Sequence, residues 1–240
     1  MGYKFFKLKM KRYSISAFFP AYGDEKTIGK MVLDMREVLE KISDDYEIIV
    51  VDDGGPDRSG EIADELSKKY KEVRVIHHEK NRGYGGALKS GFYNSKKELV
   101  FYTDGDAQYD VKEINKLLPY IDDYDVVNGY KIKRHDPFYR IVLGRIYHHF
   151  VKLLFNLKIK DVDCDFRLIK RKVFDVIKLE EDGGIICVEL VKKLNKNKFR
   201  IKEVPVHHYA REGESQFFKL SRILRVFRDV FRLRFKLWFK

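Results

Sequence analysis

Cysteine, proline and long apolar runs are all scarce in this sequence, and each scarcity excludes a class of protein. The two cysteines, Cys164 and Cys187, stand far apart and outside any CxxC or Cys/His cluster, which argues against a disulfide scaffold and against a zinc site. No run of about 18 uncharged apolar residues occurs, so we expect no membrane-spanning helix. The N-terminus lacks the apolar core of a signal peptide, so we expect a reducing, cytoplasmic location.

Basic residues outnumber acidic ones by 49 to 37, which leaves a formal net charge of +12. This excess predicts attraction to an anionic partner, which could be nucleic acid, phospholipid or a phosphorylated substrate. With 44% hydrophobic residues and only 5 prolines, the composition is that of a globular chain and not of a disordered one.

Short β-rich runs alternate with amphipathic segments from residue 13 onward, a rhythm typical of a mostly parallel sheet flanked by helices. The strand-like runs cover residues 13–19, 46–51, 73–78, 98–103, 125–129, 166–170 and 199–207. Helical spacing predicts helices over residues 28–42, 84–94, 111–120, 140–156 and 188–195, with one more helix capped by Ser59. We therefore predict an α/β domain over residues 13–216, between a basic arm at 1–12 and a distinct segment at 217–240.

Acidic or glycine-rich loops follow four of the predicted strands. In open α/β sheets, ligands bind beyond the carboxyl ends of the strands, so these loops are the first place to look for a site. They comprise residues 20–25, 52–57, 81–87 and 104–108. Their common place after strands predicts one shared site at one edge of the sheet.

Asp104 and Asp106 flank Gly105 directly after the apolar run 99–102. Hard cations such as Mg²⁺ or Mn²⁺ prefer oxygen ligands and are usually held by one or two carboxylates together with substrate phosphates. Gln108 could add a neutral amide oxygen. The tripeptide alone is also compatible with an Asx-bonded turn, but its place at a strand end favours a metal site.

The second and third loops have weaker signals. Asp52 and Asp53 could accept hydrogen bonds from a base or ribose, or they could form a helix cap or a solvated turn. Residues 81–86 form a glycine-rich turn before a helix, which could bring backbone close to a diphosphate or serve as an ordinary turn.

The segment 217–240 combines a helical apolar stripe with eight Lys or Arg residues against the single Asp229. The stripe consists of Leu220, Ile223, Leu224, Phe227, Phe231, Phe235 and Trp238. This pattern predicts an amphipathic helix that lies in the interface of a membrane with anionic lipids. The alternative is a helix that packs on the core or in a dimer and has a charged outer face.

Four motifs together resemble those of family 2 glycosyltransferases, most of all the branch related to dolichyl-phosphate mannosyltransferase and bacterial polyprenyl-phosphate glycosyltransferases. They are Pro20-Ala21-Tyr22 with Glu25, Val50-Val51-Asp52-Asp53-Gly54, Asn81-Arg82-Gly83-Tyr84-Gly85 and Asp104-Gly105-Asp106-Ala107-Gln108. The likeness covers roughly residues 13–219. It implies a Rossmann-like GT-A fold, a UDP- or GDP-sugar donor, and Mg²⁺ or Mn²⁺ as cofactor.

By matching positions, the resemblance implies several groups of site residues. Nucleotide-sugar binding falls to Pro20, Ala21, Tyr22, Glu25, Asp52, Asp53, Arg82, Gly83, Gly85, Asp104, Gly105 and Asp106, and metal binding to Asp104, Asp106 and Gln108. The catalytic candidates are Asp104, Asp106, Asp163 and Asp165, of which Asp165 replaces a glycine of the family pattern. The resemblance also points to Arg211 and Ser215 for an acceptor or its phosphate, and Lys131, Arg140 and Arg145 are added as candidates because they are cations in the same half of the chain.

The resemblance also implies inversion at the anomeric carbon by direct displacement. A polyprenyl or dolichyl phosphate acceptor is already an anion and needs cations to hold it, whereas a sugar hydroxyl needs a carboxylate base such as Asp163 or Asp165. The QxxRW motif of processive synthases is missing, so we predict transfer of a single sugar.

The first expectation is a lipid-phosphate acceptor at the inner face of the cell membrane, with no nucleic-acid partner. The alternatives are a sugar-hydroxyl acceptor in cell-envelope glycan synthesis, a nucleotidyltransferase, and a non-enzymatic basic binder. The sequence has no GxGxR-like signature after its first strand, which disfavours the nucleotidyltransferase.

Overall fold

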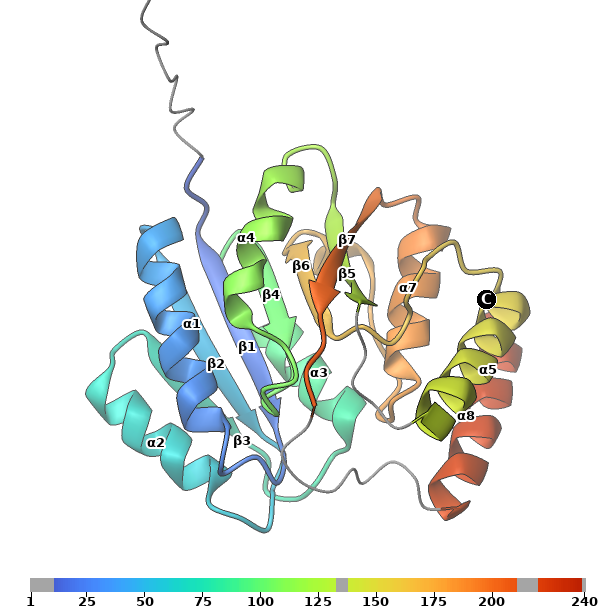
Figure 1. The fold of residues 1–240 in the computed structure, drawn as a ribbon, viewed down its shortest axis with the longest axis horizontal. Helices are drawn as coiled ribbons and strands as arrows, with labels where there is room; N and C mark the ends of the chain where they lie inside the picture. Colours follow the sequence, from blue (N-terminus) through green and yellow to red (C-terminus); the bar gives the residue numbers. More distant parts are fainter. Residues whose placement is uncertain (1–10, 133–137, 211–219, 239–240) are drawn as a thin grey trace, which may run out of the picture.

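The computed structural model describes residues 11–132, 138–210 and 220–238, which form a seven-stranded sheet with helices on both faces (Figure 1). The strands are β1 (Ile15–Ala21), β2 (Tyr46–Asp52), β3 (Val73–His77), β4 (Leu99–Thr103), β5 (Val126–Ile132), β6 (Phe166–Lys170) and β7 (Ile201–His207). Their order across the sheet is β3-β2-β1-β4-β6-β5-β7. The predicted basic arm lies mostly outside the described residues.

The sheet has a parallel half and a mixed half. β3, β2, β1 and β4 pair in parallel, β6 runs antiparallel to both β4 and β5, and β5 pairs in parallel with β7. Every residue of β1 and β4 is buried, as expected for strands covered on both faces. The register aligns Ala21 with Asp52, so the loops after β1 and β2 begin at the same edge. The predicted mostly parallel α/β sheet is confirmed.

The helices follow the predicted segments with two exceptions. They are α1 (Ile28–Ile42), α2 (Ser59–Lys69), α3 (Tyr84–Asn94), α4 (Ile114–Leu117), α5 (Phe138–Phe155), α6 (Val173–Val176), α7 (Ile186–Lys196) and α8 (Leu220–Trp238). The helix predicted over 111–120 is broken into η1 (Val111–Glu113), α4 and η2 (Leu118–Tyr120), where Pro119 cannot donate a helical hydrogen bond. The one-turn helix α6 was not predicted.

The prediction that Ser59 caps α2 is wrong, because Ser59 is already the first helical residue and Arg58 holds the cap position. The Ser59 hydroxyl accepts from the Asp24 N–H at 2.9 Å and donates to Asp57 Oδ1 at 2.7 Å. Ser59 therefore ties the loop after β1 to the loop after β2 instead of closing its own helix.

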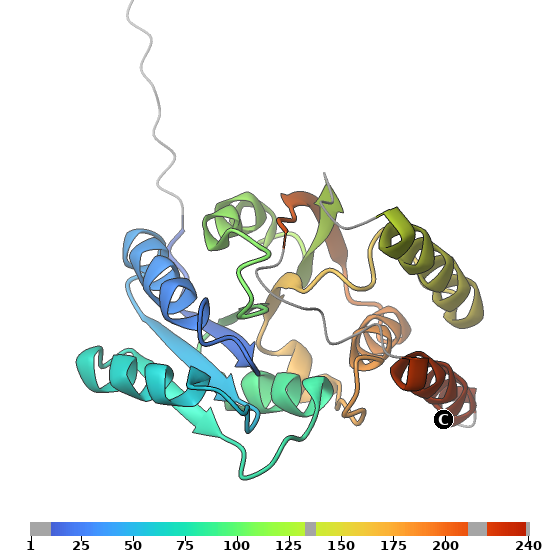
Figure 2. The same ribbon diagram turned by 60° about the horizontal axis from the view of Figure 1, so that its bottom comes forward.

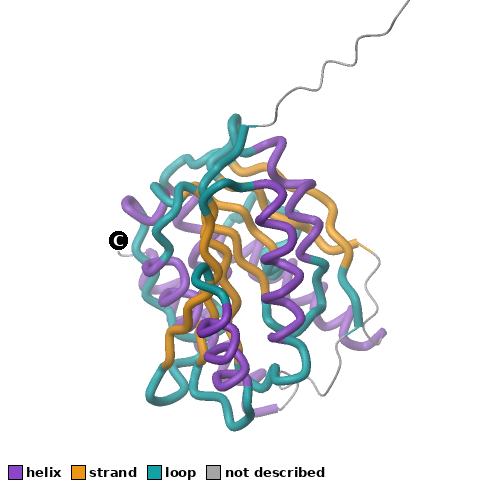
Figure 3. The backbone as a smooth tube through the Cα atoms, turned by 90° about the vertical axis from the view of Figure 1, so that its left-hand side faces the viewer, coloured by secondary structure: helices purple, strands orange, loops and turns teal. Residues whose placement is uncertain are grey.

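Two apolar layers cover the two faces of the sheet. One contains Met35 and Leu39 of α1, and the other contains Leu88 and Phe92 of α3. Seen from the side of α1 and α2, helices lie over the strands (Figure 3). None of the helices in the described ranges combines the length and apolarity that crossing a bilayer requires.

The C-terminal helix α8 packs on the domain through a face that the sequence pattern did not single out. Val230 and Leu233 are fully buried in a cluster with residues of α5 and α7, and Val226 and Leu237 pack against it. α5 and α8 lie side by side at the end of the molecule remote from α1 and α2 (Figures 1 and 2). The core-packing alternative is therefore correct for this face of α8.

Candidate active site

The loops after β1 and β4 pack directly on each other at the carboxyl edge of the sheet. The Thr27 hydroxyl donates to the Gly105 carbonyl oxygen at 2.7 Å. A Cβ atom on Gly105 would lie 3.2 Å from the carbonyl oxygen of Pro20 and 3.6 Å from a carboxylate oxygen of Asp24. A glycine between the two aspartates therefore allows a close approach of the two loops.

Asp104 and Asp106 lie together in this packed region. The Tyr84 hydroxyl donates to Asp104 Oδ1 at 2.8 Å, and Asp106 is only 7% exposed. Burial raises the pKa of Asp104 well above its ordinary value, and the nearby carboxylates of Asp165 and Asp106 raise it further. Neighbouring carboxylates that repel one another in this way are stabilised by a bound cation, so the residues fit the predicted metal.

A sharp turn fixes the second half of this motif. Ala107 has a φ of 60°, in the left-handed region that side-chain residues rarely adopt, and this lets the Gln108 N–H reach Asp106 Oδ1 at 3.1 Å. The Gln108 amide donates to the Tyr209 carbonyl oxygen at 3.0 Å, and the Tyr209 N–H donates back to the Gln108 carbonyl oxygen at 2.8 Å. The chain beyond β7 is thereby held beside the aspartate pair.

Within the described ranges, no three His, Cys, Asp or Glu side chains form a ready-made metal cage. Magnesium-type sites in transferases commonly use one or two carboxylates and complete their coordination with substrate phosphates and water. The Asp104 and Asp106 pair has the composition of such a half-site. The expected resident metal would be Mg²⁺ or Mn²⁺.

Asp52 and Asp53, both predicted to bind the nucleotide, make protein contacts in the structure. Asp52 Oδ2 lies 2.9 Å from His77 Nδ1, and its other oxygen accepts from Gly55 N–H at 3.4 Å. Asp53 is 3% exposed and holds both His78, at 2.6 Å, and the backbone N–H of Arg82, at 2.8 Å. Asp53 thus supports the turn after β3, while Asp52 keeps part of its carboxylate exposed.

The glycine turn before α3 lies against the loop at 180–182. The Gly83 N–H donates to the Asn81 side chain at 3.1 Å, and the Gly85 N–H donates to the Asp182 carbonyl oxygen at 2.7 Å. A Cβ atom on Gly85 would lie 2.4 Å from the Glu181 carbonyl oxygen. These N–H groups are already engaged within the protein, so the turn serves chain packing, and its predicted contact with the sugar nucleotide gains no support here.

The catalytic candidates from the second half of the chain approach the aspartate pair. Asp165 accepts from the Tyr102 hydroxyl at 3.4 Å, and its charge raises the pKa of both Asp104 and Asp163. Burial raises the pKa of Asp163 to about 6. Lys131 donates to the Asp163 carbonyl oxygen and lies 3.9 Å from Asp161.

Arg167 fixes the base of this arrangement. Its fully buried guanidinium donates to the Asn128 side chain, the Tyr102 hydroxyl and the Val162 carbonyl oxygen. Strands β4, β5 and β6 are therefore joined by one cation behind Asp165. Burying a charged group destabilises the fold unless all its hydrogen-bond donors find acceptors. We therefore expect the three bonds of Arg167 to be needed for the strands behind the candidate site to pack as they do.

The remaining predicted residues divide into two groups. Tyr22 is 43% exposed at the rim of the site, and Glu25 accepts from the Arg58 N–H at 3.2 Å. Arg145 is exposed on α5. The side chain of Arg140, and all of Arg211 and Ser215, lie outside the described residues, so their predicted roles stay predictions.

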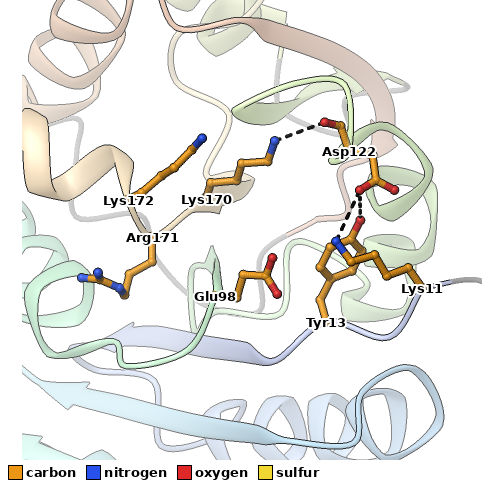
Figure 4. Close-up of a pocket in the computed structure, with 7 residues that line it drawn as sticks. All are labelled: Lys11, Tyr13, Glu98, Asp122, Lys170, Arg171 and Lys172. Atoms are coloured by element: carbon orange, nitrogen blue, oxygen red, sulfur yellow. Dashed lines mark hydrogen bonds and ion pairs between the residues drawn. The ribbon is translucent and has the colours of Figure 1, made fainter.

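A pocket of about 390 Å³, shown in Figure 4, lies at the opposite edge of the sheet, where β4 begins and β6 ends. It opens near the start of β1, where the Tyr13 hydroxyl donates to Asp122 at 2.5 Å. Lys11 lies 3.7 Å from the same carboxylate, and Lys170 donates to the Asp122 carbonyl oxygen at 3.2 Å. Because these charged groups already pair with one another, we assign the pocket no part in the site.

Three site residues were not assigned from the sequence: Tyr84, Asp24 and Tyr209. Tyr84 and Asp24 stand inside the loops that were singled out, so their position at strand ends was a usable signal. Tyr209 also follows a predicted strand, 199–207, but only the packing of the chain beyond β7 brings it to Gln108.

The family model described as glycosyl transferase family 2 matches residues 16–178. The glycosyltransferase AglD of Haloferax volcanii is 28% identical over 202 residues, which cover 80% of this chain but only 32% of that relative. A dolichyl-phosphate beta-glucosyltransferase of Trichomonas vaginalis is 27% identical over 93% of this chain and 75% of its own length.

The crystal structure of glucosyl-3-phosphoglycerate synthase from Mycobacterium tuberculosis, in complex with Mn²⁺, UDP and glucosyl-3-phosphoglycerate, is similar with a TM-score of 0.70 at 17% identity. The similarity covers 91% of this chain and 77% of that one and confirms the predicted GT-A fold. The family match covers well over half of the chain and decides against the nucleotidyltransferase and the non-enzymatic binder. The chain belongs to glycosyl transferase family 2, as its four motifs predicted.

Proposed function

We propose that this protein moves a single sugar, with inversion, from a UDP- or GDP-sugar to a polyprenyl or dolichyl phosphate at a membrane surface. The observation that carries the proposal is the pair of Asp104, which is half-buried, and Asp106, which is buried, at the edge where the loops after β1 and β4 meet. The relative from Trichomonas vaginalis, by its name, acts on dolichyl phosphate, which favours a lipid phosphate here as well.

The donor end of the site is formed by Asp104, Asp106 and Gln108. When bound there, Mg²⁺ or Mn²⁺ would supply Lewis-acid stabilisation of the departing nucleoside diphosphate. Tyr84 orients the Asp104 carboxylate through its hydroxyl, and the left-handed turn at Ala107 orients that of Asp106. Preorganised groups of this kind lower the barrier because they need no rearrangement during the reaction.

The acceptor decides whether a protein base is needed. A phosphate monoester has a second pKa of about 6 and is largely dianionic at neutral pH, so no side chain must remove a proton. A sugar hydroxyl does need a base, and Asp163, with its pKa raised to about 6 by burial, has a suitable value. Transfer to a sugar hydroxyl is therefore the second candidate function.

The membrane contact is proposed for an aromatic face of α8 formed by Phe227, Phe231 and Phe235. These side chains are 43%, 49% and 63% exposed, and they point away from the face that Val230 and Leu233 bury. An apolar helix face that remains exposed after packing, on a chain with a strong positive charge, fits the interface of an anionic bilayer.

Helix α5 extends this aromatic face. Phe150 contacts Phe227 and Phe231, with ring centroids 5.9 and 6.2 Å apart. Ile146 and Leu153 lie one turn before and one turn after Phe150 and are 62% and 86% exposed. Two adjacent helices thus offer one apolar surface, which suits an enzyme whose acceptor is embedded in lipid.

Transfer assays test the proposal. The full chain is incubated with Mn²⁺, labelled UDP- and GDP-sugars, and either polyprenyl phosphate or a soluble sugar acceptor. We expect the label to appear in the lipid phosphate. If none of the donors gives a labelled lipid, the proposal is overturned. Asp163→Asn separates the two candidates, because it should abolish transfer to a hydroxyl and leave transfer to a lipid phosphate nearly intact.

A further inference from the structure

Part of the basic face of α8 binds the protein's own acidic loop instead of facing solvent. Arg232 Nη2 lies 2.5 Å from Glu181 Oε2, and Lys236 Nζ lies 3.3 Å from Glu181 Oε1. Lys236 also reaches Glu180 at 2.8 Å. Glu181 is only 3% exposed, so this contact is made by a carboxylate that water hardly reaches.

The same loop supports the start of α3. The carbonyl oxygen of Asp182 accepts from the N–H groups of Gly85, at 2.7 Å, and Gly86, at 3.3 Å. The Asp182 carboxylate lies 2.6 Å from Lys89, one turn further along α3. The close approach leaves no space for a side chain at Gly85, so we expect a displacement of the loop to displace the start of α3 as well.

The start of α3 in turn orients the candidate metal ligand. Tyr84 stands immediately before Gly85 and donates its hydroxyl hydrogen to Asp104 Oδ1 at 2.8 Å. Contacts therefore run without a gap from Arg232 through Glu181, Asp182 and Gly85 to Tyr84 and Asp104.

A second anchor fixes the loop from α7. The buried carboxylate of Glu189 accepts from the N–H groups of Glu180 at 3.0 Å and Glu181 at 2.9 Å. The backbone of the loop thus has its own support, and α8 adds the hold on the Glu181 side chain. Removing that hold should loosen the loop without unfolding it.

We propose that Glu181 and Arg232 are positioning residues through which the docking of α8 sets the affinity of the donor site for metal and nucleotide. The inference rests on the proposed function, since it assumes a metal and nucleoside diphosphate at Asp104. Its consequence is that an anionic membrane regulates donor binding through α8. Lipid phosphates that compete for Arg232 and Lys236 would release Glu181 and thereby weaken the binding of metal and nucleotide. Coupling between such sites typically changes affinity by a few-fold to about thirtyfold.

The test is calorimetric titration of the full chain with Mn²⁺ together with UDP or GDP. We expect Arg232→Ala to weaken binding by about three- to tenfold and Arg232→Lys to restore most of it. Arg171→Ala is the matched control, because Arg171 forms an ion pair with Asp175 at 3.1 Å outside this chain of contacts, and its affinity should equal that of the parent. The double variant with Arg232→Ala and Glu181→Gln should lose less affinity than the sum of the two single losses, since both changes remove the contact between Arg232 and Glu181.

Each outcome decides a different claim. If the parent binds neither Mn²⁺–UDP nor Mn²⁺–GDP, the proposed function and this inference both fail. If the parent binds and Arg232→Ala binds equally well, only the inference is overturned. If Arg232→Ala does not fold, Glu181→Gln decides instead, because it keeps the side-chain volume and removes the charge that Arg232 pairs with, and unchanged affinity in that variant overturns the inference.

Discussion

Replacing Phe227, Phe231 and Phe235 together by serine should release the protein from anionic vesicles. Their exposed fractions of 43%, 49% and 63% amount to about one and a half fully exposed phenylalanine side chains. Full burial of one such side chain contributes about 1.5–3 kcal/mol, so insertion of this aromatic face is worth about 2–4.5 kcal/mol. Vesicle affinity should therefore fall by about 30- to 2,000-fold in the triple variant.

Co-sedimentation with vesicles of increasing anionic lipid content measures this loss. The control carries Leu33→Ser and Val176→Ser, which remove 42% and 59% exposed apolar side chains from α1 and α6. The triple variant should unfold at a lower thermal midpoint than the parent, because Phe227 and Phe231 are half-buried and contact Phe150, so both variants are compared at a temperature at which both are folded. An unchanged vesicle affinity in the triple variant, or an equal loss in the control, would refute a membrane contact through the aromatic face.

Three further changes probe the site and the fold. Asp106→Ala should abolish metal-dependent binding of UDP or GDP in calorimetry, and binding that survives would remove Asp106 from the metal site. Gly91→Ala should lower the free energy of unfolding by about 1–3 kcal/mol in urea unfolding, because its Cβ would lie 2.3 Å from the Phe18 ring. An unchanged free energy of unfolding would show that the ring can move aside. Burial raises the pKa of Glu47, but hydrogen bonds from Ser16 and other donors outweigh it and hold the pKa below the ordinary 4.5. The charged carboxylate therefore stabilises the fold above pH 4.5, and this contribution is lost as pH falls through the lowered pKa. The difference in the free energy of unfolding between the parent and Glu47→Gln should therefore become smaller in acid. A difference that stays constant with pH would contradict this.

Most of the fold was predictable because its signals are local. The strand runs, the helical spacing of 28–42 and the loops at strand ends depend on residues a few positions apart. The aspartate pair was found for the same reason, since Asp104 and Asp106 come shortly after the apolar run 99–102. The sequence by itself therefore determined the class of fold, the edge that carries the candidate site and the family.

Only the tertiary structure decided how the loops share their partners. His77 and His78 lie 25 residues from Asp52 and Asp53 along the chain, and the parallel pairing of β2 and β3 brings them together. The partial engagement of Asp52 and the structural role of Asp53 follow from that pairing. The spacing of residues in the sequence does not show whether an aspartate binds a histidine of the same protein or a nucleotide.

The C-terminal helix shows the same limit. Its periodicity correctly predicted an amphipathic helix, and the sequence also indicated an apolar stripe with basic neighbours. Packing on α5 and α7 then buried Val230 and Leu233, left Phe235 exposed and paired Arg232 with Glu181, 51 residues earlier. Helical period is a local property, whereas the choice of which face is buried and which cation is neutralised depends on chain segments that only folding brings together.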